Sequence, residues 1–399
     1  VNLNTKQMKN ITFVSFVLLI ILSTNYNFAQ WQPTGITTGN VLHIASNSSS
    51  IIVNNSGLKY STDGGNNWIS MNYSPTLALT ANEEGVFAAG SQSRVSKTTN
   101  MGIDWIHNMV SAADGVFTLH TSGNNVYAGA RNYGLRKSKD NGNSWGIVTF
   151  PFGTVSSVFA YGTFVYTALE NVGVSVSSNN GSSWSSAQLG GIFMNVVHTN
   201  GLFVFAGSRA NGVYLSSDNG SSWTQTTLNN IHVTSITSSG SNIFAGSTNS
   251  GVYFSGNNGT SWQQVNTGLT NLNIRALHVH GQFIYAGTSG AGLWKRPLSE
   301  VLGLQNISAE VPDEYSLQQN YPNPFNPTTR IKFSLPADGY TSLKIYDVNG
   351  SLVNTLVAQE LRKGTYEADF NASGIASGIY YYQLSSGNFT KTHKMILVK

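Results

Sequence analysis

The chain has 399 residues, of which 10% are charged, 41 are glycine and none is cysteine. A chain of this length buries a hydrophobic core, and its many glycine, serine, threonine, asparagine and aromatic residues favour strands and turns over helices. The lack of cysteine excludes disulfides and a cysteine-linked lipid anchor. Removal of Lys6 and Lys9 with a signal peptide lowers the net charge from +4 to +2, and a nearly neutral surface with scattered basic residues argues against nucleic acid as a partner.

The first 29 residues have the layout of a secretory signal peptide. Lys6 and Lys9 precede an apolar run over residues 11–22, and polar residues then lead to Ala29. The run is too short to cross a membrane, which needs about 20 apolar residues. We therefore expect residues 1–29 to be removed during export and the mature chain to contain no transmembrane span. A retained anchor helix is the alternative.

A repeat of almost constant length follows. Its tryptophans recur at intervals of 37 to 40 residues and are Trp31, Trp68, Trp105, Trp145, Trp184, Trp223 and Trp262. All but the first close the pattern Ser/Thr-x-Asp/Asn-x-Gly-x-x-Trp, whose third position is occupied by Asp63, Asn100, Asp140, Asn179, Asp218 and Asn257. A fixed period in this range is typical of solenoids and propellers.

The repeated pattern has the chemistry of a hairpin turn. A short Asp or Asn side chain accepts bonds from backbone N–H groups downstream, Gly adopts a positive φ, and Trp anchors the returning strand. Half of the copies carry Asn in place of Asp, and both side chains can accept these bonds. The interchange predicts a structural turn and argues against a carboxylate that performs acid–base catalysis.

The pattern resembles the Asp-box repeat of sialidase-like propellers, of the photosystem II assembly factor family and of some plant-polysaccharide hydrolases. The resemblance covers roughly residues 31–298. In those families the box is shared by enzymes and non-enzymes, so the resemblance implies a propeller and no particular reaction.

Each repeat contains four short predicted strands, which make one propeller blade. In the repeat that starts at Trp184, strands are expected at the tryptophan and over residues 194–198, 202–207 and 212–216. We therefore expect an all-β fold with a seven-bladed β-propeller over residues 30–298. The first unit opens with an outer strand and the last unit lacks one, so the segment after Trp31 is expected to complete the last blade.

The repeat stops after Pro297. We expect a linker over residues 299–313, followed by a small immunoglobulin-like β-sandwich over residues 314–399. Asn349-Gly350 is a strong signal for a two-residue hairpin turn. Predicted strands of the sandwich cover residues 330–335, 342–347, 365–370, 378–384 and 390–398.

This tail resembles the type A C-terminal sorting domain of the type IX secretion system. The matching residues lie in Tyr-Pro-Asn-Pro near its start and at the end of the chain, and are Tyr321, Pro322, Asn323, Pro324, Lys394, Met395 and Lys399. The resemblance implies the type IX secretion machinery as a partner and a final location outside the cell, either released or attached to the outer-membrane surface. An ordinary immunoglobulin-like binding module is the alternative.

The predicted ligand face is the end of the propeller opposite the boxes. We expect its loops to present Arg131, Tyr133, Glu170, Arg209 and Phe152, because aromatic rings beside Arg suit recognition of a glycan or a surface protein. Carboxylates outside the boxes are scarce, whereas a glycoside hydrolase needs two beside the scissile bond. We predict a non-catalytic recognition module without a cofactor. A glycoside hydrolase on the same scaffold and a structural or assembly role are the alternatives.

Some histidines occupy similar places in the predicted innermost strands, namely His43, His120, His198 and His278. Several imidazoles that face one channel could hold a transition metal. We expect no metal site, because a wide ring seldom gives converging ligands and the units between carry Thr80, Ala160 and Thr237.

Overall fold

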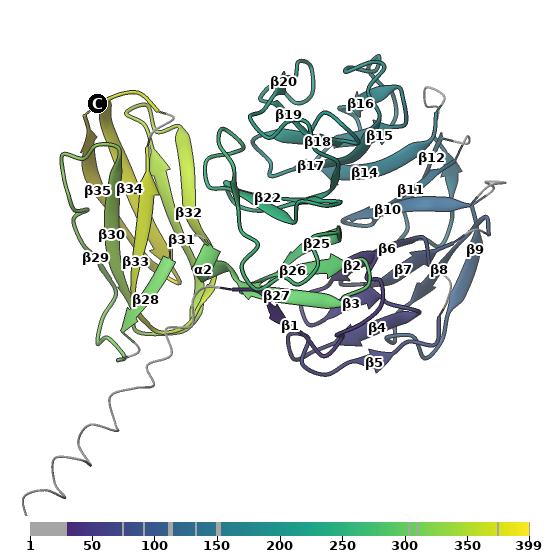
Figure 1. Ribbon diagram of the computed structural model, residues 1–399, viewed down its shortest axis with the longest axis horizontal. Helices are drawn as coiled ribbons and strands as arrows, with labels where there is room; N and C mark the ends of the chain where they lie inside the picture. The colour runs from purple at the N-terminus through teal and green to yellow at the C-terminus, as the bar shows by residue number, and fades with distance from the viewer. Residues whose placement is uncertain are drawn as a thin grey trace, which may run out of the picture.

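In a computed structural model the chain is almost entirely β (Figure 1). The structure describes residues 30–398 except 74–75, 91, 111–114, 132–133, 149–152, 302–303, 309 and 373–374. The predicted signal peptide lies outside the described residues. Within them, the helix is the single turn α2 (Leu298–Val301), which joins a ring of sheets to two further sheets.

The described strands of the N-terminal part form seven sheets. In chain order the strands are β2 (His43–Ser46), β3 (Ile51–Asn54), β4 (Leu58–Ser61) and β5 (Ile69–Ser70); β6 (Ala78–Asn82), β7 (Gly85–Ala89), β8 (Arg94–Thr98) and β9 (Ile106–Met109); β10 (Val116–Ser122), β11 (Asn125–Ala130), β12 (Gly134–Ser138) and β13 (Gly146–Ile147); β14 (Val155–Tyr161), β15 (Phe164–Leu169) and β16 (Gly173–Ser177); β17 (Met194–Thr199), β18 (Val204–Ser208), β19 (Val213–Ser216) and β20 (Thr224–Gln225); β21 (Val233–Ser239), β22 (Asn242–Ser247), β23 (Val252–Ser255) and β24 (Gln263–Gln264); and β25 (Ile274–His280), β26 (Phe283–Thr288) and β27 (Leu293–Pro297), joined by β1 (Gln32–Pro33).

The sheets form a closed ring. The first strand of each sheet contacts the first strand of the next, and β25 of the last sheet contacts β2 of the first. The predicted closure is confirmed, because β1 pairs antiparallel with β27. Trp31, just before β1, is 2% exposed and its indole N–H donates to the Val265 carbonyl at 2.6 Å. The ends of the ring are therefore held by backbone pairing and by one buried aromatic side chain.

Glycines in the second strands allow neighbouring sheets to pack closely. A Cβ built on Gly129 would lie 2.7 Å from Val155 Cγ1, and one on Gly207 would lie 2.6 Å from Val233 Cγ1. Both valines begin the innermost strand of the following sheet. The glycines at this position thus follow from the close approach of the next sheet.

The fourth sheet differs from the prediction of four strands per repeat. It contains β14, β15 and β16, and the residues after Trp184 form no strand. Gln188 makes only an isolated bridge to Val174, with N–H···O distances of 2.8 Å in both directions. The segment Ser185-Ser186-Ala187 lacks the β-branched and aromatic residues that favour a strand.

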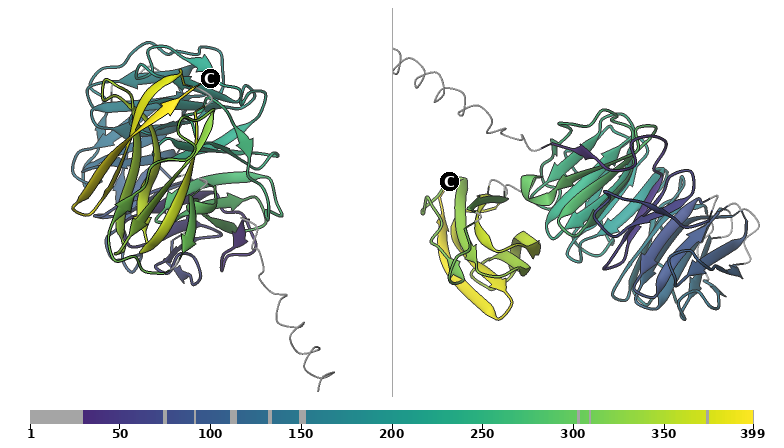
Figure 2. Two further views of the ribbon diagram at one scale, coloured as in Figure 1. Left: turned by 90° about the vertical axis from the view of Figure 1, so that its left-hand side faces the viewer. Right: turned by 90° about the horizontal axis from the view of Figure 1, so that it is seen from below.

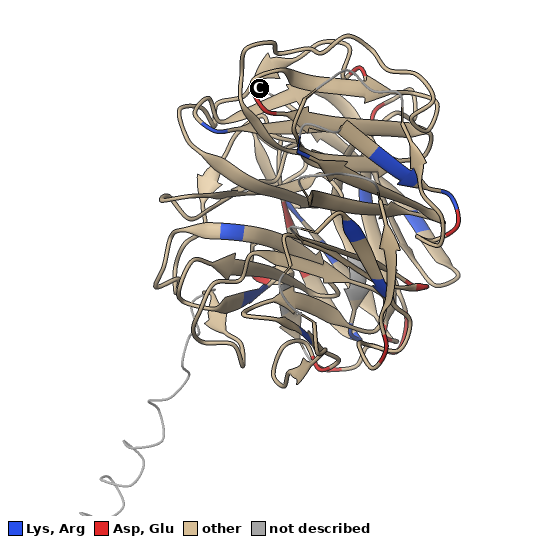
Figure 3. Cartoon of the chain, turned by 90° about the vertical axis from the view of Figure 1, so that its right-hand side faces the viewer, with Lys and Arg blue, Asp and Glu red and all other residues tan. Residues whose placement is uncertain are grey.

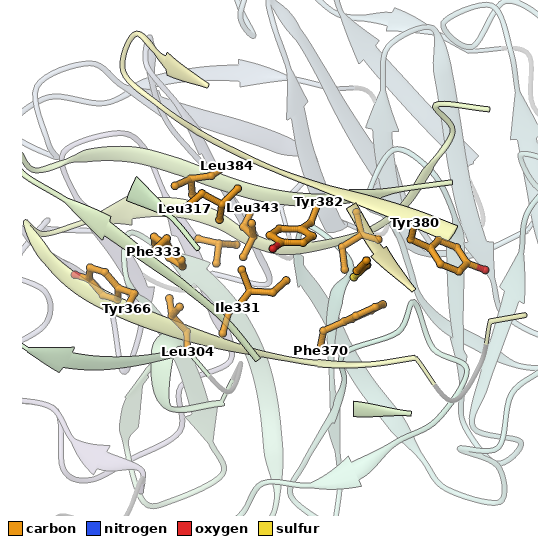
Figure 4. Packing of buried hydrophobic residues seen from close by; sticks show 14 of the residues in the cluster. Leu304, Leu317, Ile331, Phe333, Leu343, Tyr366, Phe370, Tyr380, Tyr382 and Leu384 are labelled. Carbon is orange, nitrogen blue, oxygen red and sulfur yellow. The ribbon is translucent and has the colours of Figure 1, made fainter. Parts of the chain in front are cut away.

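The C-terminal part forms two four-stranded sheets. One contains β28 (Leu304–Ser308), β33 (Gly364–Asn371), β30 (Thr328–Leu335) and β29 (Ser316–Leu317), and the other contains β32 (Leu352–Leu361), β31 (Gly339–Tyr346), β34 (Gly378–Ser386) and β35 (Phe389–Leu397). Side chains from both sheets meet in one core, including Phe333, Phe370 and Tyr382 (Figure 4). The views in Figure 2 place these sheets beside one edge of the ring.

Two details of the tail differ from the sequence interpretation. Leu304–Ser308, within the predicted linker, forms β28 and pairs with β33. The turn at Asn349-Gly350 joins β31 to β32 as predicted, but it spans residues 347–351 instead of two residues. Asp347 Oδ1 accepts from the N–H groups of Asn349 and Ser351, which stabilises this longer turn.

Candidate functional site

The ring has two different ends. Because successive strands of a sheet are antiparallel, the connections from first to second and from third to fourth strand lie at one end, and the remaining connections lie at the other. We call the end with the repeated turns the box face. The opposite end, with the β11–β12, β15–β16 and β18–β19 connections and the segments that enter each first strand, is the loop face.

The turn at Asp218 shows how the box face is built. Asp218 Oδ1 accepts from Ser216 Oγ at 2.7 Å and from the N–H of Ser222 at 2.8 Å, and Gly220 has a φ of 87°. The Trp223 indole donates to the Gly220 carbonyl at 3.1 Å. Hydrogen bonds from Ser222 lower the pKa of the Asp218 carboxyl to about 2. The carboxylate is therefore ionised and holds a turn, which is the wrong state for a general acid.

Asn preserves this turn. Asn257 Oδ1 accepts from Ser255 Oγ at 2.9 Å and from the N–H of Ser261 at 3.0 Å, as the Asp copies do at the same positions. Only the contact to the next serine hydroxyl changes direction: Asn257 Nδ2 donates to Ser261 Oγ, whereas Ser222 Oγ donates to Asp218. The hydrogen bond that Oδ1 accepts from a backbone N–H is therefore the contact that both Asp and Asn provide in this turn.

The described residues among the predicted binding residues all lie on the loop face. Arg131 follows β11, Glu170 follows β15 and Arg209 follows β18, so they belong to three consecutive sheets. Arg131 and Arg209 are exposed, and Glu170 is half-buried with its backbone N–H bonded to Thr154. Tyr133 and Phe152 lie outside the described residues.

Each of the two arginines lies over an aromatic ring. The guanidinium carbon of Arg131 is 5.9 Å from the centre of the Phe117 ring, and that of Arg209 is 5.3 Å from the centre of the Phe193 ring. The aromatic face restrains the guanidinium, and both arginines remain exposed to solvent. Charged residues are otherwise sparse over the ring (Figure 3).

The first strands of the sheets surround a central channel, and a small cavity opens where this channel reaches the loop face. Its volume is about 220 Å³, and residues of all the first strands of the ring line it. His43 and Arg275 lie side by side in this lining, and burial together with the Arg275 charge lowers the pKa of His43 to about 4. The histidine is neutral at neutral pH, so the cation at the channel mouth is Arg275.

The sequence interpretation missed most of the residues that shape this mouth. A β-bulge after the first residue of β10, β14, β17, β21 and β25 places one extra residue there. These residues are Phe117, Ser156, Asn195, Thr234 and Arg275. Ser156, Asn195 and Thr234 donate to backbone carbonyls of the following sheet. Phe117, Ser156, Asn195 and Thr234 recur every 39 residues and Arg275 follows after 41, and this spacing, close to the repeat length, was the available signal.

The histidines line the channel, but not as one equivalent set. His120 pairs with Tyr127, His198 with Phe205 and His278 with Tyr285, whereas His43 pairs with Asn54 and Ala45 takes the equivalent place. In the fourth sheet this place belongs to Phe159 rather than to the predicted Ala160, because Phe159 is the residue opposite Tyr166. The strand pairing, which sequence spacing alone does not fix, sets the register.

His120, His198 and His278 each form a hydrogen bond to the next sheet of the ring. His120 contacts the Ala160 carbonyl at 3.2 Å, His198 contacts Ser238 Oγ at 2.8 Å, and His278 contacts Ser46 Oγ at 2.8 Å. Burial lowers the pKa of His120 and His278 to about 4 and that of His198 to about 3, although each ring keeps some surface toward the channel. No group of three or more His, Asp or Glu among the described residues could hold a metal ion.

The two ends of the predicted sorting motif meet in the C-terminal sheets. Asn323 Oδ1 accepts from the N–H of Ile396 at 2.9 Å, and Phe325 bonds to Ile396 and Val398. Tyr321 is 80% exposed, whereas Met395 is fully buried. Pro322 and Pro324 flank Asn323. Lys394 in β35 pairs with Tyr381 in β34. Lys399 lies outside the described residues.

Comparison with known families identifies the tail. Residues 319–399 match the family described as secretion system C-terminal sorting domain. This match indicates handling by the type IX secretion system and a location at the cell surface or outside the cell. Within the described residues, no helix is both long and apolar enough to cross a membrane. No curated protein matches the chain by sequence.

Solved structures similar to the chain are β-propellers. YCF48 bound to D1 peptide has a TM-score of 0.55 at 13% identity, over 68% of this chain and 96% of that one. The GH74 xyloglucanase from Xanthomonas campestris has a TM-score of 0.55 at 13% identity, over 76% and 59%. The WD40 propeller domain of Doa1 has a TM-score of 0.54 at 11% identity, over 68% and 99%. At such identities the likeness establishes the fold alone: the chain carries a β-propeller followed by a type IX sorting tail.

Proposed function

We infer that the protein is an exported, non-catalytic recognition module that binds a glycan or a surface protein on the loop face of a seven-bladed propeller. Residues 1–29 serve as the signal peptide, and the propeller spans residues 30–298. The closed ring of seven sheets supports this blade number.

The tail is an immunoglobulin-like sandwich that acts as the sorting domain. Two four-stranded antiparallel sheets around one core support this fold. Because β28 pairs within these sheets, the unit starts at residue 304, and the linker shrinks to the segment around α2.

The observation that carries the binding proposal is the pair of exposed arginines, each supported by a ring on the loop face. Arg209 and Arg275 both act on the pKa of His232, which they lower after the effect of burial. The guanidinium groups of Arg209 and Arg275 therefore both lie close enough to His232 to disfavour its protonation. Among the described loops of this face, the acidic side chain is Glu170, so the ligand is expected to present acidic groups.

A glycoside hydrolase on this face would need two carboxylates about 5 to 10 Å apart. By chain position the acids of the loop face are Glu170 and Asp114, and Asp114 lies outside the described residues. The carboxylates of the boxes are at the other end of the ring. This distribution favours recognition over hydrolysis.

The test is a binding screen and a hydrolysis screen on the purified full-length exported protein, with acidic and neutral glycans and with surface proteins. We expect saturable binding of an acidic ligand, no released product, and weaker binding for R131A and R209A. K139A, next to a box turn, is the matched control and should bind like wild type. Turnover that is lost in E170Q would contradict the proposal and establish the hydrolase.

A further inference from the structure

One outer strand of the ring differs from the others. The outer strands β1, β5, β13, β20 and β24 have two residues each, whereas β9 has four. β9 is the last strand of its sheet, and no described strand pairs with its outer edge. Figure 1 shows β9 on the side of the ring away from the C-terminal sheets, so its exposure does not depend on the sorting tail.

The outer edge of β9 presents the backbone groups of two residues. The Val110 N–H donates to the Ser93 carbonyl at 2.9 Å, on the side of the strand where β8 lies. Backbone groups point alternately to the two sides of a strand, so those of Asn108 also face β8. Those of His107 and Met109 therefore face outward. A two-residue outer strand offers only one residue in this way.

Apolar side chains are exposed along this edge. Ile103, in the turn before β9, is 79% exposed, Ile106 is 57% exposed and Met109 is 71% exposed. Edge strands are usually protected from association by charged residues, by proline or by short length, and β9 has none of these protections. The place of Ile103 is polar in the other boxes, which carry Asn66, Asn143, Ser182, Ser221 and Thr260.

This edge is complementary to itself. An antiparallel pair of β9 strands related by a two-fold axis places His107 of each copy opposite Met109 of the other, so every outward N–H and C=O group finds a partner. Asn108 of one copy then lies opposite Asn108 of the other, on the axis. The charges agree with this direction, because Asp104, at the box-face end of one copy, approaches the end of the edge that carries Arg94 in the other.

We propose that the outer edge of β9 is the interface of a homodimer, in which the second sheets of two copies join into one continuous antiparallel sheet. The self-complementary hydrogen-bonding groups and the opposite charges at the two ends favour a second copy over a partner of different sequence. The contact also covers the exposed side chains of Ile106 and Met109. The two loop faces then point in opposite directions, and neither they nor the sorting tail take part in the interface.

The first test measures the mass of the purified exported protein by sedimentation velocity over roughly 1–100 µM. A concentration-dependent change from monomer to dimer is expected. M109K places a charge at both symmetric cross-strand pairs and should raise the dissociation constant of the dimer about tenfold or more. T224K, which places the same charge on the exposed strand β20, is the matched control and should keep the wild-type dissociation constant.

Cysteine cross-linking tests the register, because the chain has no cysteine of its own. Across the axis the two Cα atoms of residue 108 would lie about 4.5 Å apart, whereas those of residue 109 would lie roughly 8 Å apart, beyond the disulfide limit of about 7 Å. N108C should therefore form a covalent dimer on oxidation, and M109C should not. A monomer at every concentration would overturn the proposal, as would equal cross-linking of N108C and M109C or equal dissociation constants for M109K and T224K. Copurification of a different polypeptide that M109K releases would also overturn it, because the edge would then belong to another partner.

Discussion

Acid should destabilise the ring through the histidines that bridge its sheets. His198 is neutral in the folded protein, because burial lowers its pKa from the usual 6.5 to about 3. The unfolded chain therefore binds one proton more than the folded chain between these values. The stability that depends on neutral His198 is complete above pH 6.5 and is lost as the pH falls toward 3.

The magnitude follows from the width of this window. Each pH unit below 6.5 costs up to about 1.4 kcal/mol per histidine, so His198 accounts for up to about 2 kcal/mol of the loss between pH 7.5 and pH 5. His120 and His278, whose pKa values are also lowered by burial, add similar losses. The free energy of unfolding should be nearly constant from pH 7 to 8 and fall steeply below 6.5.

The assay is urea unfolding at pH 7.5, 6 and 5, followed by tryptophan fluorescence. H198Q keeps a polar group that can hydrogen-bond Ser238 Oγ but cannot take up a proton, so its loss of stability between pH 7.5 and 5 should be about 2 kcal/mol smaller than that of wild type. T237V, at the equivalent place in the sixth sheet, is the control and should retain the wild-type pH dependence. Equal pH dependence of H198Q and wild type would refute this reasoning.

The remaining predictions concern the turns and the packing of the ring. D218N should keep the thermal midpoint of wild type, whereas D218A should lower it, because only Asn retains the oxygen that accepts the backbone N–H bond; equal midpoints would contradict the turn role. W31A should lower the free energy of unfolding in urea by about 3–5 kcal/mol, since it removes a buried aromatic side chain at the closure. G207A should cost about 1–3 kcal/mol, because its Cβ would overlap Val233, while G190A, with open space around its Cβ, is the matched control. A cost in G190A equal to that in G207A would contradict the packing argument.

Local chemistry explains what could be predicted from the sequence. The turn pattern fixes its own geometry, since Ser216, Asp218 and Gly220 make their bonds within five residues. The closure followed from an unpaired first strand and an incomplete last repeat, and β1 pairs with β27 as expected. Arg131, Glu170 and Arg209 lie on one face because antiparallel connections alternate between the two ends of a sheet.

Features that depend on contacts between distant segments could not be predicted in this way. The register of His43 is set by its pairing with Asn54, which shifts it two residues from the place of the other histidines. The pairing of β28 with β33 joins residues about 60 apart, so the composition of residues 304–308 gave no sign of it. The docking of the tail on the ring joins Ser241 to Thr355, which lie 114 residues apart, so it could not be predicted from either segment alone.

The most direct test of the central claim is hydrogen–deuterium exchange of the full-length protein with and without the acidic ligand found in the binding screen. Recognition on the loop face predicts slower exchange in the segments around Arg131, Glu170 and Arg209, and unchanged exchange in the turn at Asp218. Protection confined to the turns of the box face, with no change around Arg131 and Arg209, would contradict the account.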